Sequence, residues 1–141
     1  MNTQSENISD INSKDIMYAT GKRKTSIAKI WLKKGSGKIS INGKDFKDYF
    51  KRASHIMQLL RPFEIINQST DYDVKCSVTG GGLTGQVGAM VHGISKALLQ
   101  FDSNLKPTLK KEKLTTRDSR SVERKKYGHR KARRSFQFSK R

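Results

Sequence analysis

The last 36 residues of the chain, 106–141, carry most of its charge and few side chains that could be buried. They hold 15 Lys and Arg against 3 Asp and Glu, so +12 of the net charge of +18 lies there. A segment this basic cannot bury enough apolar surface to fold by itself. We therefore expect it to become ordered against a polyanion, and nucleic acid is the partner that such charge favours.

The basic tail limits the size of the folded core. Residues 1–16 contain many Ser and Asn and show no apolar periodicity, so we expect a disordered leader there. The 89 residues between leader and tail are enough for one hydrophobic core. The predicted organisation is a leader at 1–16, an α+β globular domain at 17–105 and an extended basic C-terminal arm at 106–141.

The composition disfavours several classes of protein. The single cysteine, Cys76, allows no internal disulfide, which fits a reducing cytosol. The first residues lack the apolar stretch of a secretory signal, and no run of about 20 apolar residues could span a membrane. The tail also has too few apolar residues for a membrane-surface helix. We expect a cytoplasmic protein with no membrane partner.

Three segments alternate in polarity as strands do. Residues 26–33 and 38–41 flank the turn formed by residues 35–37, and we expect them to pair as antiparallel strands. A third strand is predicted over 72–78, where Tyr72, Val74, Cys76 and Val78 share one face.

Apolar side chains at helical spacing cover much of the remaining core. Residues 46–50 and 56–63 predict helical segments, with Pro62 ending or bending the second. The longest helical pattern ends near Phe101, and a short helical turn is predicted around Pro107. Strands and helices do not alternate strictly. The predicted fold is therefore α+β, a small two-layer globule with a mostly antiparallel sheet packed by helices.

A glycine-rich loop lies between the third strand and the long helix. Gly80, Gly82 and Gly85 fit the pattern G-x-G-x-x-G of dinucleotide sites. In such a site an acid at the position of Asp102 would cap a second parallel strand, and no apolar strand follows the helix. Two other interpretations stay open: a tight strand-to-helix turn, or backbone N–H groups that approach an RNA phosphate.

Groups that could catalyse a reaction or bind a metal are scattered. His55, His92 and His129 have no cysteine or paired carboxylate at metal-ligand spacing, so we expect no metal and no cofactor. Cys76 falls on the apolar face of its strand, which predicts a buried side chain rather than a nucleophile.

Two basic groups are candidates for contact with nucleic acid. Residues 22–24 precede the first predicted strand and could contact consecutive phosphates, or form a solvated charge run. The tail mixes Arg, which binds phosphate bidentately, with Lys. Tyr127, Phe136 and Phe138 could stack on unpaired bases or pack against a protein neighbour. The predicted RNA-binding residues are Lys22, Arg23, Lys24, Arg117, Arg120, Arg124, Lys125, Lys126, Tyr127, Arg130, Lys131, Arg133 and Arg134.

Several separate motifs resemble one family. They are ATGKRKTS at 19–26, GGGLTGQ at 80–86, LTTRD at 114–118, and ERKKYG from 123 continuing to FSKR at 138–141. In order and spacing the chain resembles the bacterial-type small-subunit ribosomal protein S9 family from about residue 17 onward. The resemblance implies a structural constituent of the subunit head, not an enzyme. It also implies a globule similar to the second domain of ribosomal protein S5.

The resemblance further implies a division of roles along the arm. Residues 117–134 would line a path through ribosomal RNA, as would residues 22–24. Ser139, Lys140 and Arg141 match the tip, which would approach the anticodon stem of peptidyl-site tRNA during translation. The implied partners are ribosomal RNA, that tRNA and neighbouring head proteins. Two competing hypotheses are a nucleotide-dependent enzyme that uses the glycine loop and a general nucleic-acid chaperone.

Overall fold

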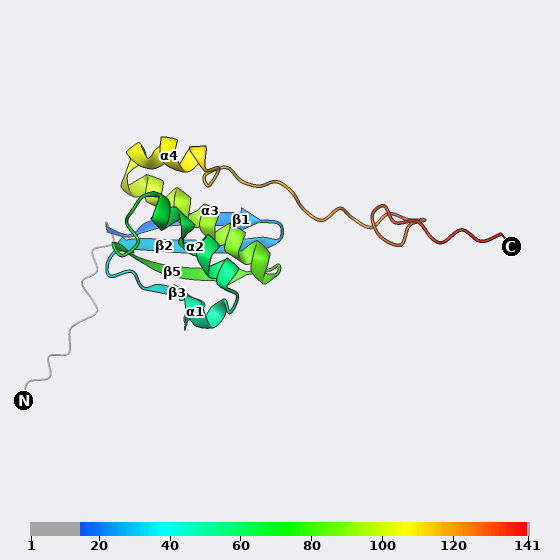
Figure 1. Ribbon diagram of the computed structural model, residues 1–141, viewed down its shortest axis with the longest axis horizontal. Coiled ribbons are helices and arrows are strands. Elements are labelled where there is room, and N and C mark those ends of the chain that lie inside the picture. Colours follow the sequence, from blue (N-terminus) through cyan, green and yellow to red (C-terminus); the bar gives the residue numbers. More distant parts are fainter. Residues whose placement is uncertain (1–14, 141) are drawn as a thin grey trace, which may run out of the picture.

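The computed structural model describes residues 15–140, so the expected leader at 1–16 lies almost wholly outside the described residues. The described chain forms a five-stranded sheet in the order β1-β2-β5-β3-β4 (Figure 1). The fold is α+β, as predicted, and its sheet is mixed because β3 runs parallel to β5. The elements are β1 (Met17–Arg23), β2 (Ser26–Lys34), β3 (Ile39–Ile41), β4 (Lys44–Asp45), α1 (Phe46–Tyr49), α2 (Ala53–Ile65), β5 (Tyr72–Thr79), α3 (Leu83–Phe101), the 3₁₀ helix η2 (Ser103–Leu105) and α4 (Lys106–Lys111).

Strands β2 and β5 follow the predicted alternation and supply the sheet side of the core. In β2 the side chains of Ala28, Ile30 and Leu32 are fully buried, whereas the residues between them are more exposed. Ile30 lies opposite Cys76 of β5, whose side chain is buried as predicted. Ile30 also lies opposite Ala19 of β1 on its other flank. One face of the sheet therefore carries the apolar side chains.

The expected antiparallel pairing of residues 26–33 with 38–41 is wrong, because β5 lies between β2 and β3. The connection from β2 to β3 is attached to the start of β5. The carboxylate of Asp73 accepts hydrogen bonds from the backbone N–H groups of Ser36 (2.8 Å) and Lys38 (2.9 Å). Gly37 in the same connection has a φ of 89°, which favours glycine. These contacts, distant in sequence, direct β3 to the far side of β5.

Strand β1, which the sequence did not predict, forms one edge of the sheet beside α3. The Lys96 ammonium group donates a hydrogen bond to the backbone carbonyl of Thr20 (3.1 Å). The side-chain amide of Gln100 donates to the carbonyl of Tyr18 (2.9 Å). Two side chains of α3 therefore bind backbone oxygens of the edge strand.

The close approach of β1 and α3 depends on two glycines. A Cβ atom added to Gly21 would collide with the backbone at Ala89 and Gly93. A Cβ added to Gly93 would lie 2.7 Å from the Ile30 side chain and 3.0 Å from the Gly21 nitrogen. Because neither residue has a side chain, α3 lies directly against the sheet, and its apolar residues are buried there.

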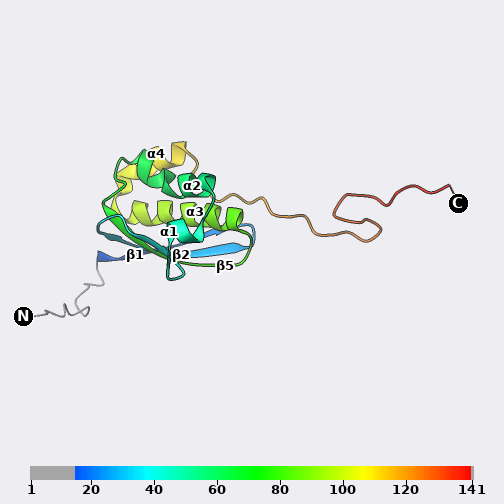
Figure 2. The same ribbon diagram turned by 60° about the horizontal axis from the view of Figure 1, so that its bottom comes forward.

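The helices lie on one side of the sheet, and α2 packs over α3 on the side away from the strands (Figure 2). Leu59 and Phe63 on α2 are buried. Pro62 lies within this helix without ending it, because α2 continues to Ile65. The described helices include none long and apolar enough to cross a lipid bilayer.

The folded part continues past residue 105, where the arm was expected to begin. Residues 106–111 form α4, on which Leu109 is fully buried, and Leu114 packs against the core. Glu112, just after α4, forms an ion pair with Arg61 of α2 at 2.8 Å. From 115 to 140 the chain has no helix or strand. Its first residues, to about 122, lie beside the globule, and Figure 1 shows the rest extending away from it.

Replacing Gly21 by Ala should destabilise the protein by about 1–3 kcal/mol, because the added methyl group collides with backbone atoms that cannot rotate away. Urea denaturation followed by circular dichroism measures the change. Gly82→Ser is a matched control, since a Cβ there meets nothing within 4 Å and φ is −96°. Its effect should stay within about 0.5 kcal/mol. Equal losses in both variants would contradict the close contact of β1 with α3.

Candidate nucleic-acid interface

The basic motif at 22–24 ends β1 rather than preceding the first strand, as had been expected. Lys24 lies in the turn to β2 with a φ of 52°. Arg23 extends toward α3, and a Cβ atom added to Gly88 of that helix would collide with the Arg23 side chain. The glycine therefore leaves room for Arg23 to lie across the helix.

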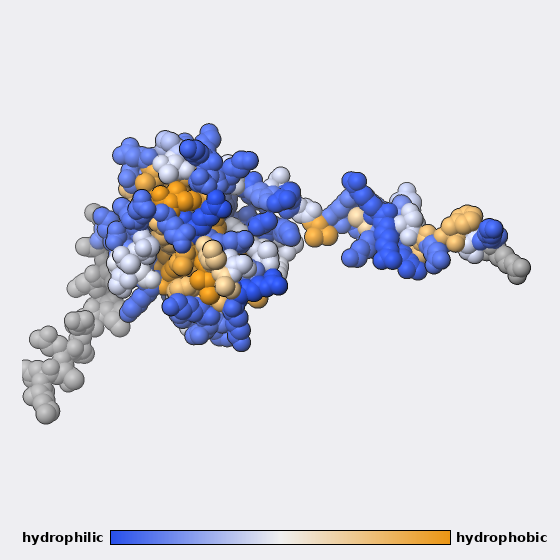
Figure 3. Space-filling model, in the orientation of Figure 1, coloured by the Kyte–Doolittle hydropathy of each residue, from blue (hydrophilic) through white to orange (hydrophobic). Residues whose placement is uncertain are grey.

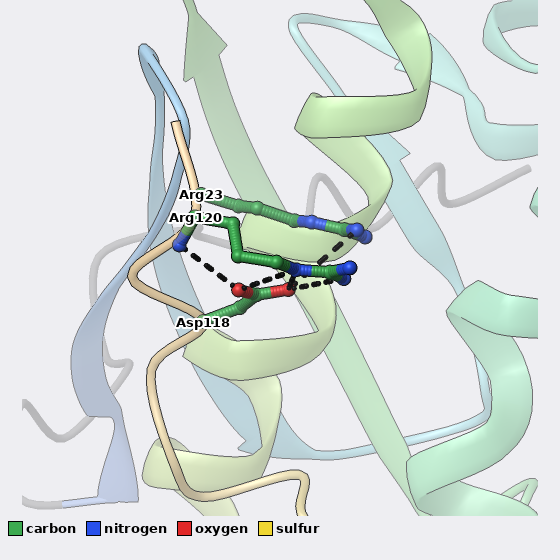
Figure 4. Close-up of polar contacts among 3 residues, drawn as sticks. All are labelled: Arg23, Asp118 and Arg120. Atoms are coloured by element: carbon green, nitrogen blue, oxygen red, sulfur yellow. Dashed lines mark hydrogen bonds and ion pairs between the residues drawn. The ribbon is translucent and has the colours of Figure 1, made fainter. Parts of the chain in front are cut away.

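Asp118, at the start of the arm, joins Arg23 to Arg120 (Figure 4). Its carboxylate accepts hydrogen bonds from Nε (3.1 Å) and Nη2 (2.8 Å) of Arg120. The Arg23 guanidinium lies 3.7 Å away. Hydrogen bonds from Arg120, assisted by the charge of Arg23, hold the pKa of the Asp118 carboxyl group far below its usual range. The carboxylate therefore stays ionised at physiological pH and offsets one of two guanidinium charges, so the cluster remains positive.

A hollow of about 450 Å³ opens beside this cluster, between the end of β1, helices α2 and α3, and the first residues after α4. Positive residues outnumber negative ones in its walls. A concave surface with excess positive charge attracts anions, and the planar guanidinium of Arg fits a phosphate bidentately. The charged residues that line it are Lys22, Arg23, Arg61, Lys113 and Arg120, with Glu112 and Asp118.

His92 on α3 belongs to the wall of the same hollow. Burial lowers the pKa of its imidazole, and the positive charges of Lys96 and Arg117 lower it further, although a hydrogen bond with the Thr115 backbone acts in the opposite direction. The ring is therefore neutral at pH 7. Within residues 15–140, no group of His, Cys, Asp and Glu is arranged to hold a metal ion.

Two positions of the glycine loop require glycine because of their backbone conformation and close neighbours. Gly80 and Gly81 have φ angles of 74° and 63°. A Cβ added to Gly80 would lie 2.6 Å from the carbonyl oxygen of Thr25, and one added to Gly81 would collide with the Ser26 hydroxyl group. That hydroxyl donates a hydrogen bond to the carbonyl of Gly80 (3.1 Å). The loop is therefore a tight strand-to-helix turn packed against the turn between β1 and β2.

The loop does not begin a dinucleotide-binding unit. Helix α3 is followed by η2 and α4, and in the described part of the chain no further strand follows. Contact of the loop with an RNA phosphate stays a prediction. A hollow of about 510 Å³ lies there between Lys24, the hydroxyl groups of Thr25 and Thr84, and Ser121 of the arm.

Within the arm, Glu123 binds two of the predicted RNA-binding cations. Its carboxylate accepts hydrogen bonds from Lys126 (2.7 Å) and from Nε of Arg133 (3.0 Å). These two hydrogen bonds lower the pKa of the Glu123 carboxyl group. Residues ten positions apart are thereby joined, and the intervening chain forms a loop.

Backbone contacts complete this loop. His129 and Ser135 form an isolated antiparallel bridge, and the N–H of Arg130 donates to the carbonyl of Arg134 (2.8 Å). The Arg130 guanidinium lies 5.7 Å from the centre of the Phe136 ring, within the range of a cation–π contact.

The structure leaves the other predicted site residues dispersed along the arm. Tyr127 is 94% exposed and Phe138 is 85% exposed, so neither ring packs into the globule. Arg141, part of the predicted tip, lies outside the described residues. The further exposed residues are Arg117, Arg124, Lys125, Lys131, Arg134, Ser139 and Lys140.

The sequence did not predict the roles of Asp118 and Glu123. Both are isolated acids in a segment dominated by Arg and Lys. An acid in such a segment is a signal for an ion pair, but its partner cannot be chosen among so many cations. Arg23 in particular is distant in sequence from Asp118.

Comparison with known protein families gives a match over most of the chain. A family model described as ribosomal protein S9/S16 matches residues 21–141. The matched range contains the basic end of β1, the glycine loop, the Asp118 cluster and the arm. Because this range covers most of the chain, the protein belongs to the ribosomal protein S9/S16 family, whose members are structural, non-enzymatic proteins of the small ribosomal subunit that bind ribosomal RNA.

Proposed function

We propose that this protein lies in the head of the small ribosomal subunit, that its arm passes through folded ribosomal RNA, and that the tip of the arm contacts peptidyl-site tRNA. The observation that carries the proposal is the concentration of charge in residues 106–141, which have a net charge of +12. Residues 115–122 lie beside the end of β1 and the glycine loop, and the chain beyond them projects from the globule and is mostly exposed (Figure 1). Phosphates of surrounding RNA would neutralise this charge and order the segment.

Two regions contact the RNA in this proposal. The first is the hollow at the base of the arm, whose walls include Lys22, Arg23 and Arg120. The second is the arm itself. Lys24 lies in the turn after β1 and extends the first region. Tyr127 belongs to the second region, where its exposed ring could stack on a base. The arm residues concerned are Arg117, Arg124, Lys125, Lys126, Arg130, Lys131, Arg133 and Arg134.

The tip has a separate role. Ser139, Lys140 and Arg141 match the end of the family motif, and two of the three are cations. Ser139 and Lys140 follow the exposed Phe138 in sequence, and the described chain ends far from the globule (Figure 1). A short cationic end suits contact with the phosphate backbone of a second RNA, here the tRNA.

Neighbouring proteins of the subunit head are the other proposed partners. The proposed location is the ribosome, in the cytoplasm. Figure 3 shows a mostly hydrophilic arm with a few apolar side chains, and apolar surface gathered over the helices of the globule. Met57 on α2 is 69% exposed, as expected for a side chain that a partner covers. The mixed sheet with helices on one face supports a fold similar to the second domain of ribosomal protein S5.

Replacing Arg130, Lys131, Arg133 and Arg134 together by Ala should weaken RNA binding and reduce its salt dependence. If each residue contacts one phosphate, the slope of log K against log salt should fall by roughly 3. Fluorescence anisotropy with an RNA fragment from the subunit head measures this between about 50 and 200 mM KCl.

The matched control removes four exposed lysines of the globule, Lys34, Lys44, Lys51 and Lys106. The control should change the slope by less than half as much. Equal slopes in the two variants would show that the arm has no special role. Equal affinity of the intact protein for unrelated RNAs would favour a general chaperone.

Deleting residues 139–141 should leave subunit assembly unchanged and accelerate dissociation of peptidyl-site tRNA, by less than about tenfold because two cations are lost. Filter binding of labelled tRNA to reconstituted subunits measures the rate.

Replacing Lys22, Arg23 and Lys24 by Ala should reduce incorporation into subunits without changing tRNA release. A tip deletion that blocked assembly would contradict separate roles for arm and tip.

The pKa of His92 should rise when RNA binds. Burial lowers this pKa most in the free protein, and the charges of Lys96 and Arg117 lower it further; phosphates in the hollow would offset those two charges. Nuclear magnetic resonance titration of the imidazole, with and without the RNA fragment, measures the shift. Arg117→Gln should raise the pKa in the absence of RNA. An unchanged pKa at saturating RNA would show that phosphates do not enter the hollow.

A further inference from the structure

The face of the sheet opposite the helices carries a group of side chains that neither the core nor the arm uses. Figure 2 shows the described helices on the other side of the sheet. Successive side chains of a strand point to opposite faces of the sheet. The neighbours of the residues in question are buried on the helix side: Ala19, Ala28, Ile30, Leu32, Val74 and Cys76. The open face therefore carries Tyr18 and Thr20 of β1, Lys29 and Trp31 of β2, and Lys75 of β5.

Two aromatic rings lie next to each other on this face, one on the edge strand β1 and one on β2. Tyr18 pairs directly with Trp31 across the antiparallel strands. Their ring centres are 5.3 Å apart with an interplanar angle of 48°. The Tyr18 hydroxyl accepts a hydrogen bond from the Thr20 hydroxyl (3.2 Å), and Tyr18 is 45% exposed. Adjacent aromatic rings held on rigid strands offer a surface on which an unpaired base can stack.

Lysines surround the aromatic pair. Lys75 of β5 lies directly across from Trp31, and Lys29 lies two residues before Trp31 on β2, on the same face. Lys33 lies two residues after Trp31 on β2, across from Asp73 of β5. The Asp73 carboxylate already accepts the backbone hydrogen bonds of Ser36 and Lys38 and is directed into that connection. The face therefore presents mainly positive charge beside its rings.

A hollow of about 430 Å³ lies next to the indole ring. Its walls are formed by one aromatic, three cationic, one acidic, one hydroxyl and two aliphatic residues: Trp31, Lys33, Lys38, Lys75, Asp73, Ser40, Ile16 and Val74. Its volume falls within the range of about 300–1,000 Å³ that is usual for small-molecule sites. It combines an aromatic wall with cations and a hydroxyl group, which are the groups that bind a base, phosphates and a ribose.

We propose that this open face is a second RNA site, at which an unpaired nucleotide stacks on Tyr18 and Trp31 while Lys29, Lys33 and Lys75 contact the flanking phosphates. The proposal rests on the proposed function as an RNA-bound subunit protein and adds a surface separate from the hollow and the arm. RNA is favoured over a protein partner because an apolar partner would leave three lysines unpaired.

The chain has one tryptophan, so intrinsic fluorescence reports on this face in the full-length protein. A short single-stranded oligoribonucleotide should quench Trp31 emission, and a duplex of equal charge should quench it far less, because its bases are not free to stack. The variant with Arg130, Lys131, Arg133 and Arg134 replaced by Ala should bind more weakly yet show the same quenching at saturation.

Trp31→Leu should weaken single-strand binding by roughly 5- to 150-fold while leaving duplex binding unchanged, measured by anisotropy of labelled RNA. Circular dichroism checks the fold. Lys29→Gln with Lys75→Gln, which keeps the indole, should weaken binding and lower the salt slope by roughly 1–2. Lys34→Gln with Lys51→Gln is the charge-matched control, and it should leave the binding of the short oligonucleotide close to the wild type.

The outcomes separate this proposal from the proposed function. RNA binding that depends on the arm but leaves Trp31 emission unchanged would overturn the open-face site alone. Absence of any RNA binding would overturn both. Quenching by an acidic peptide and not by single-stranded RNA would assign the face to a protein partner and overturn the proposal.

Discussion

The contact between the backbones of β1 and α3 at Gly21 and Gly93 is the constraint on which the other features depend. Because no side chain separates them, α3 lies flat on the sheet and covers its apolar face. The same placement brings Arg23 across α3 at Gly88. The base of the arm, at Asp118, therefore meets the end of β1, and the positive hollow forms where the globule and the arm join.

Acidic side chains organise the positive charge of the arm without cancelling it. Asp118 binds Arg120 and lies beside Arg23, while Glu123 binds Lys126 and Arg133. Solvent-exposed ion pairs of this kind contribute little to stability. Their effect is on geometry, since they hold guanidinium and ammonium groups close together against repulsion. Phosphates that replace these carboxylates would bind cations that are already close together.

The sequence predicts features set by neighbouring residues and misses those set by distant contacts. Alternation identified β5 and helical spacing identified α3, because burial on one face produces both patterns. The placement of β3 depends on Asp73 binding Ser36 and Lys38, which no local pattern records. The contact of Arg23 with Asp118 is equally distant in sequence. The motifs at 19–26 and 80–86 predicted the family, but not that the first ends a strand or that the second packs against its turn.

The hydrogen bonds from Lys96 and Gln100 to the β1 backbone have a consequence for the protein before it meets RNA. An edge strand can recruit a strand from another molecule through its unpaired backbone groups, which is a common start of aggregation. Here the carbonyls of Tyr18 and Thr20 are already bound by side chains of α3. At this edge a strand from another copy would have to displace these side chains before it could pair with those two carbonyls, which disfavours edge-to-edge association in the interval between synthesis and assembly.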